Sequence, residues 1–238
     1  VEAGEHHAPF PAHRIDLPAG RYETILPPST VADLMIYAYW TASARDAEEG
    51  RNVFAGAPNQ SRIGEALSPL PLRLYSDPSY PGLQCAPFEI ATESGGGLQS
   101  VFDNGLPSPA VDWIRDGRLA ALIRTRAWAM RSGAAARPGV GNLILSGSGD
   151  GPSEQEMIAN TERGLLLTCL WYIREVDPQT VLLTGLTRDG VFLIEHGEIV
   201  QPSCNFRFNE SPVAMLNKVV AMGPTVRAYG EESIGIPI

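Results

Sequence analysis

Side chains that could bind a metal or act on a substrate are few in this chain and widely spaced. Three of the four histidines, His6, His7 and His13, stand among glutamates near the N-terminus, a combination that can bind a divalent metal. No hydrophobic period in this stretch predicts a packed element that would fix their geometry. We therefore interpret residues 1–18 as a linker or tail whose histidines are incidental.

The three cysteines, Cys85, Cys169 and Cys204, are odd in number and far apart, so they predict neither a disulfide framework nor a metal knuckle. Cys169 falls inside an apolar run, where a buried and inert thiol is the usual outcome. Cys204 should be more exposed, but no histidine near it in the sequence could activate it. An enzyme that uses Cys204 stays an alternative.

The segment Cys204–Glu210 alternates polar and aromatic residues, as a half-buried strand does. Asn205, Arg207 and Asn209 would then share one face. Two interpretations stay open. The segment is either an edge strand with a structural arginine or, with Cys204, a rim that binds a peptide through backbone pairing and polar contacts.

A helix is predicted after Pro27-Pro28, well before this strand in the sequence. Thr30 and Asp33 form a capping box, and apolar residues then recur at helical spacing until about Glu49-Gly50. The resulting stripe contains Val31, Leu34, Met35, Ala38 and Ala42. It should pack this helix against a sheet.

The last third of the chain carries the strongest strand signal. Residues 164–176 are predicted to form one long central strand, which ends at Asp177-Pro178. A meander of hairpins should follow up to Val200, with one turn at His196-Gly197, and Ser211-Pro212 should begin the last helix. The fold class is therefore α+β and β-rich, with a mostly antiparallel or mixed sheet and two or three packed helices.

Composition narrows the possible partners. The 238 residues are 44% hydrophobic, which excludes a disordered chain, and no apolar run approaches the ~18 residues that a membrane-spanning helix needs. A net charge of −9, with Lys218 as the single lysine, argues against nucleic acid. We expect a soluble, cytoplasmic protein that binds neither nucleic acid nor membranes.

Many short segments, in the same order, resemble the C-terminal part of the TldD/PmbA family, whose members were once called modulators of DNA gyrase. The sequences of residues 174–178 and 205–212 most resemble those of the actinobacterial branch of that family. The resemblance covers residues 19–238 and rests on Gly164-Leu165-Leu166-Leu167-Thr168, Val176-Asp177-Pro178, Arg188-Asp189-Gly190-Val191-Phe192 and Asn205-Phe206-Arg207-Phe208. The N-terminal α/β domain of the family has no counterpart in this chain.

The resemblance implies a peptidase of two related subunits, TldD and TldE (PmbA), that trims unfolded or leader peptides inside a closed chamber. The TldD-type subunit holds zinc through HExxxH on a helix and a cysteine near its C-terminus. When the shared segment Gly50-Arg51-Asn52-Val53-Phe54 is used as an anchor, the motif positions fall on Met35, Ile36 and Trp40, and the stretch 226–230 contains no cysteine. These side chains cannot replace histidine and glutamate.

The sequence therefore predicts a TldE/PmbA-type subunit that has no metal, no cofactor and no catalytic residue of its own. Its expected partners are a zinc-containing TldD-type subunit and a peptide substrate, and association into a homo-oligomer is possible through exposed sheet edges. The alternative is an assembly or interaction module without a part in the chemistry.

Overall fold

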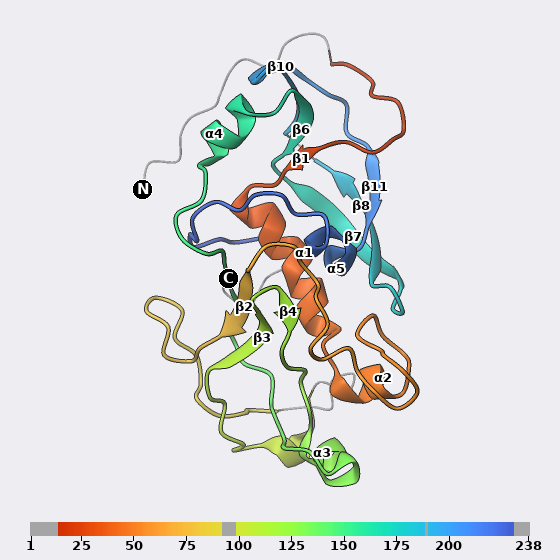
Figure 1. Ribbon diagram of the computed structural model, residues 1–238, viewed down its shortest axis with the longest axis vertical. Helices are drawn as coiled ribbons and strands as arrows, with labels where there is room; N and C mark the ends of the chain where they lie inside the picture. The colour runs from red at the N-terminus through yellow and green to blue at the C-terminus, as the bar shows by residue number, and fades with distance from the viewer. Residues whose placement is uncertain (1–13, 92–98, 189, 231–238) are drawn as a thin grey trace.

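The computed structural model describes residues 14–91, 99–188 and 190–230, which form helices and strands in three sheets (Figure 1). The α-helices are α1 (Pro28–Trp40), α2 (Ala44–Glu48), α3 (Arg126–Ser132), α4 (Glu154–Ala159) and α5 (Pro212–Leu216), and η1 (Val101–Asp103) is a 3₁₀ turn. The strands are β1 (Thr24–Ile25), β2 (Arg73–Ser76), β3 (Val111–Arg115), β4 (Arg118–Leu119), β5 (Ile144–Ser146), β6 (Arg163–Leu167), β7 (Leu170–Asp177), β8 (Leu182–Thr187), β9 (Val191–Glu195), β10 (Glu198–Pro202) and β11 (Arg207–Glu210).

The three sheets have the orders β1-β6-β9-β10, β11-β8-β7 and β4-β3-β2-β5. Only the pairing of β1 with β6 is parallel among these ladders. The predicted α+β class with mostly antiparallel strands is therefore confirmed. The described residues contain five α-helices, more than the two or three expected. Four of them are short, with seven residues or fewer.

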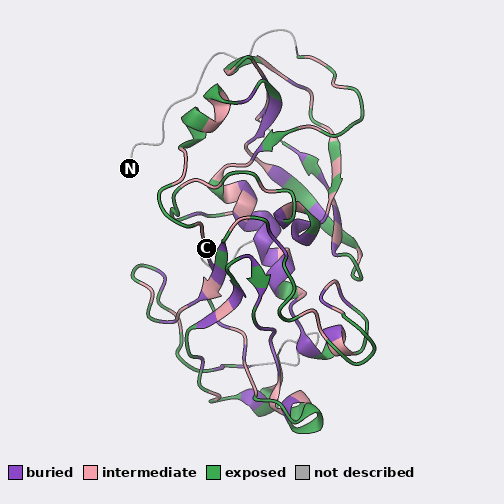
Figure 2. Cartoon of the chain, in the orientation of Figure 1, coloured by how far each residue is buried: buried purple, intermediate pink, exposed green. Residues whose placement is uncertain are grey.

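Helix α1 runs through the centre of the molecule, between the sheets (Figure 1). Eight of its 13 residues are buried, on more than one side of the helix, and Figure 2 shows it as the most continuously buried element. Its apolar side chains belong to one core cluster with residues of β2, β3, β7, β8 and α5. A helix that is apolar on most of its circumference is expected to lie in the interior rather than on a sheet surface.

The predicted start and end of this helix were wrong. Thr30 lies inside α1, where its hydroxyl donates to the carbonyl of Leu167 at 3.1 Å, and the helix begins at Pro28 after an extended Pro27. It ends at Trp40 because the buried side-chain amide of Asn52 donates to the carbonyls of Thr41 (2.8 Å) and Ser43 (3.1 Å). The chain then restarts as α2, with Ser43 as its N-cap.

The long strand predicted over residues 164–176 was also wrong. It is divided at Thr168 and Cys169 into β6 and β7, which belong to different sheets. The break is held by the Thr168 amide, which donates to the Gly190 carbonyl at 3.0 Å, and by the Arg188 amide, which donates to the Cys169 carbonyl at 3.1 Å. Cys169 is therefore half-buried at a crossing between sheets and not within a strand.

The predicted meander is divided in the same way. Strand β8 pairs with β7 and β11, whereas β9 and β10 form the hairpin that turns at His196 and Gly197, as expected. The helix start at Ser211-Pro212 is confirmed, because Ser211 caps α5 through the amide of Ala214.

The segment interpreted as a tail lies for the most part outside the described residues. Its last part contacts the domain: the Ile15 amide donates to the Pro202 carbonyl at 3.2 Å, and the Ile15 carbonyl accepts from the Cys204 amide at 2.9 Å. Within the described ranges no helix has the length and apolar character needed to cross a bilayer.

Candidate functional site

The residues that the resemblance placed at a metal motif lie on α1, and two of them are in the core. Met35 and Ile36 have no exposed surface, whereas Trp40, at the C-terminal end of the helix, is 38% exposed. The Trp40 ring packs edge-to-face on Tyr37, with centroids 5.2 Å apart. These three side chains therefore do not converge on one solvent-filled position.

The C-terminal stretch that would carry the third ligand reaches the same helix. A Cβ atom placed on Gly230 would lie 2.0 Å from Oδ1 of Asp33, and Asp33 is a buried residue of α1. Only glycine permits this close approach of the backbone. The structure thus brings together the two segments, α1 and residues 226–230, that the resemblance associates with metal binding.

The donor set at this junction does not fit zinc. Structural and catalytic zinc sites use thiolate, imidazole or carboxylate ligands, usually three or four together. The junction offers instead the thioether of Met35, the aliphatic side chain of Ile36 and a single carboxylate, that of Asp33. In residues 14–91, 99–188 and 190–230, no group of three or more His, Cys, Asp and Glu side chains lies close enough to hold a metal ion.

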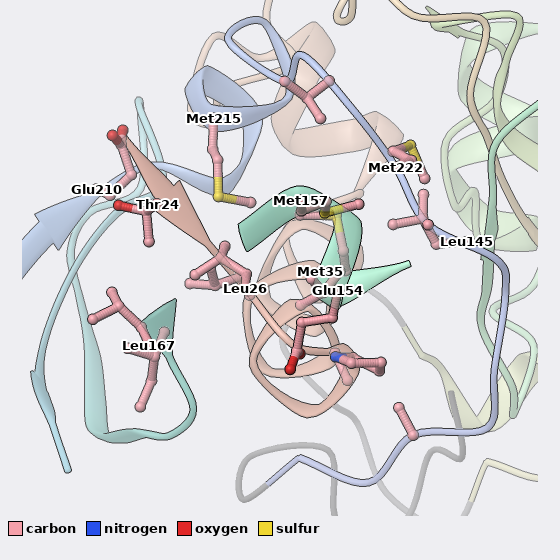
Figure 3. A pocket seen from close by; sticks show the side chains of 18 of the residues that line it. Thr24, Leu26, Met35, Leu145, Glu154, Met157, Leu167, Glu210, Met215 and Met222 are labelled. Carbon is pink, nitrogen blue, oxygen red and sulfur yellow. The ribbon is translucent and has the colours of Figure 1, made fainter. Parts of the chain in front are cut away.

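A large apolar cavity of about 1370 Å³ lies beside this junction (Figure 3). Its wall is formed by β1, α1, α5, the strand β11 and residues 218–228, with contributions from residues 80–83 and from α4. Four methionines line it, Met35, Met157, Met215 and Met222. Methionine side chains are flexible and polarizable, so a cavity lined by them can adapt to apolar groups of different shape.

The carboxylates at the cavity have defined positions. Glu210 accepts from Nζ of Lys218 at 2.9 Å and from the Ser211 amide at 2.9 Å, so its charge is compensated. Glu154 lies in the first turn of α4, where the helix dipole favours a negative charge. The cavity is therefore a mainly apolar space with a few charged groups at its wall, which is typical of a binding site.

The candidate peptide-binding residues Asn205, Arg207 and Asn209 are all exposed, and Phe206 and Phe208 between them are half-buried. The predicted alternation is thus present. A second hollow of about 420 Å³ lies over this strand and is bounded by Trp171, Leu186, Thr187, Arg188, Asn205, Phe206 and Arg207. Phe206 and Arg207 line both the hollow and the large cavity.

Cys204 is separate from this set. Its thiol contacts Asp16, and the hydrogen bond to that carboxylate raises the pKa of the thiol. A thiol with a raised pKa stays protonated and is a poor nucleophile. His196, the one histidine in the described part of the chain, lies in the β9–β10 turn with its Nδ1 2.7 Å from the Glu162 carboxylate.

Sequence reasoning missed several residues of these two hollows. Asp33, which lines neither hollow but contacts the C-terminal segment at Gly230, was interpreted only as a capping residue, although it is the one charged residue within the apolar α1. The contribution of Trp171 and Arg188 depends on the pairing of β7 with β8, which no local pattern revealed. Met215 and Met222 lie in and after a short helix whose position is set by tertiary packing alone.

The fold and the site together define a β-rich α+β domain in which a central helix and a C-terminal segment enclose an apolar cavity. A sequence model of the PmbA/TldA metallopeptidase C-terminal domain matches residues 19–238. The chain belongs to this family. Comparison with curated proteins finds no match.

Three solved structures are similar to the chain. A protein described as a modulator of DNA gyrase from Bacteroides thetaiotaomicron has 17% identity and a TM-score of 0.70, with 88% of this chain and 43% of that chain covered. A protein with the same description from Thermotoga maritima has 18% identity and a TM-score of 0.71, with 91% of this chain and 48% of that chain covered. TldE from Thermococcus kodakarensis has 19% identity and a TM-score of 0.68, with 88% of this chain and 46% of that chain covered. The chain thus spans a little under half the length of these proteins and shares their fold.

Proposed function

We propose that this chain is the C-terminal domain of a TldE/PmbA-type subunit in a heteromeric, cytoplasmic metallopeptidase. In this proposal it binds no zinc, completes the chamber and helps to hold an unfolded or leader peptide, while a TldD-type subunit provides the metal. One observation carries the proposal: Met35 and Ile36 occupy the motif positions with no exposed surface, in a helix that serves as the core of the domain.

The cavity beside α1 supports the peptide-binding part of the proposal. A volume of about 1370 Å³ exceeds the roughly 300–1,000 Å³ of sites for small ligands, so it suits several residues of a peptide. Figure 3 shows Met215 and Leu26 together with Met222 and Leu145 around one space. An unfolded peptide exposes apolar side chains that such a surface would bury.

Co-expression with a TldD-type subunit tests the partner role. We expect peptidase activity on an unfolded test protein from the pair and from neither chain alone, with zinc at one ion per pair measured by elemental analysis. One tightly bound zinc in the isolated chain would refute the metal-free part. Activity of the TldD-type subunit that is the same with and without this chain would refute the partner role.

A cavity-filling variant tests the peptide-holding role. Met215→Trp adds bulk to a residue that lines the cavity, so we expect a higher KM for peptide in the co-expressed pair with the complex still formed. Met130→Trp is the matched control, because Met130 lies on α3, is 86% exposed and lines neither hollow. Unchanged kinetics in Met215→Trp within an intact complex would favour the assembly module instead.

A further inference from the structure

The outer face of the sheet β11-β8-β7 presents two rows of side chains in register. Leu186 pairs with both Trp171 and Arg207, which forms the first row. The second row has Thr184 at its centre, paired with Arg174 and Asn209. Residues of the opposite face, among them Ile173, Leu183 and Phe208, pack into the core cluster. The two rows therefore lie on the face of the sheet that does not pack on α1. Figure 1 shows β7, β8 and β11 at one side of the molecule.

This face combines arginines with exposed aromatic surface. The Arg188 guanidinium lies 4.9 Å from the centre of the Trp171 ring, and the Arg174 guanidinium lies 4.2 Å from that of Tyr172. Trp171 and Tyr172 are 36% and 61% exposed. Stacking on an aromatic ring holds a guanidinium in place. The Arg174 guanidinium also donates to the Ile173 carbonyl at 2.6 Å.

The acidic residues near this face are directed elsewhere. Glu175 accepts from the Thr41 hydroxyl, beyond the end of α1, and Glu210 is paired with Lys218. Among the described residues that line the hollow of about 420 Å³, none is acidic. The Arg207 guanidinium donates to the hydroxyl of Thr184 at 3.2 Å and forms no ion pair with a described residue. The described lining of the hollow thus carries two arginines, Arg188 and Arg207, and no carboxylate, on a chain with a net charge of −9.

We propose that this hollow binds a carboxylate of an acidic peptide, with Arg207 as the principal contact and Trp171 and Leu186 packing against the apolar residue next to that carboxylate. The proposal rests on the proposed function in taking a peptide as the ligand. Because Phe206 and Arg207 also line the large cavity, one peptide can reach both places. Arg207 then selects peptides in which an acidic residue lies near an apolar residue.

The test uses the 238-residue chain and three fluorescent hexapeptides, with binding followed by anisotropy at low and physiological salt. The first alternates Leu and Glu and is amidated at its C-terminus, the second replaces every Glu by Gln, and the third is the Gln peptide with a free C-terminal carboxylate. We expect the first or the third to bind at least about tenfold more tightly than the second, as a charge-assisted hydrogen bond would provide. Whichever binds identifies the source of the carboxylate, a side chain or the chain end.

Variants locate the site. Arg207→Gln should remove most of this preference and leave the affinity for the Gln peptide within about twofold. The matched control is Arg163→Gln, which removes a charge from β6 in another sheet, where Arg163 is 64% exposed and paired with Glu195. Circular dichroism spectra that match the wild type show that both variants are folded.

Several results would overturn the proposal. These are equal binding of all three peptides, equal losses in the two variants, or tighter binding of a thymidine oligonucleotide than of the acidic peptide. The outcome is separable from the proposed function: a chain that activates its TldD-type partner but binds no acidic peptide refutes this inference alone. A chain that binds the acidic peptide through Arg207 but activates no partner refutes the proposed function instead.

Discussion

Replacing Ile36 by glutamate tests directly whether the second motif position lies in the core or in a chamber. Ile36 has no exposed surface, so Ile36→Glu introduces a carboxyl group that has no water around it. Losing the buried aliphatic side chain costs about 2 kcal/mol. Burial raises the pKa of the new carboxyl in the folded state, so the group stays protonated there at neutral pH.

The cost of that protonation depends on pH. An unfolded-state pKa of about 4.3 lies ~2.7 units below pH 7, which at ~1.36 kcal/mol per unit gives about 3.7 kcal/mol. The total loss of about 6 kcal/mol is comparable to the ~5–15 kcal/mol that stabilises a whole domain. At pH 5 the protonation part falls to about 1 kcal/mol. Because the folded-state pKa is raised, stability is lost as pH rises from about 4 and regained as pH falls.

Urea unfolding at pH 5 and pH 7 measures this difference. Ile36→Gln is the matched control, because it also buries a polar group but has no titratable proton. We expect Ile36→Glu to gain roughly 2.5 kcal/mol relative to Ile36→Gln between pH 7 and pH 5. Trp40→Glu, at a position that is 38% exposed, should show little of this dependence. If Ile36→Glu is as stable as the wild type at both pH values, Ile36 faces water and the metal-free core interpretation is wrong.

Three further predictions concern contacts that stabilise the domain. Glu48→Gln should destabilise the chain by about 3 kcal/mol at pH 7, because it removes the charge that pairs with Arg124, a side chain only 9% exposed. The hydrogen bond from Arg124 lowers the pKa of Glu48, so the wild type should lose stability as pH falls below about 4.5, and the variant should lose less in urea titrations. Gly230→Ala should lower the unfolding free energy by about 1–3 kcal/mol, because its Cβ would collide with Asp33, and an unchanged melting temperature would contradict this packing. Ser153→Ala removes a capping box and should weaken α4 by about 1 kcal/mol, which amide hydrogen exchange in that helix would detect.

The sequence correctly predicted those parts of the fold that depend on interactions between neighbouring residues. The capping serine of α5, the turn at His196-Gly197 and the alternation in β11 each depend on neighbouring residues, and each is present. The errors at the end of α1 and at the break after β6 have a tertiary cause. The end of α1 is fixed by Asn52, eleven residues after Thr41, and the break after β6 by Gly190, twenty-two residues after Thr168.

The candidate site was likewise predicted only in part. The sequence identified Met35, Ile36 and Trp40 through a resemblance, and their burial follows from the apolar character of α1. It also placed Arg207 and its neighbours on one face. The sequence could not reveal the cavity or the hollow, because segments far apart in the chain enclose each of them. The cavity, for example, is lined by both β1 and residues 218–228.

Strand β11 explains how one short segment can serve both hollows. Side chains alternate across a strand, so Phe208 packs into the core cluster beside the cavity while Arg207 lies on the outer face with Leu186. Gly185, opposite Phe208, has no side chain, and a Cβ there would lie 2.6 Å from the phenyl ring, so the ring can settle only against glycine. Substitutions at residue 185 should therefore disturb the cavity by displacing Phe208, whereas substitutions at residue 207 should alter recognition and leave the packing of the sheet intact.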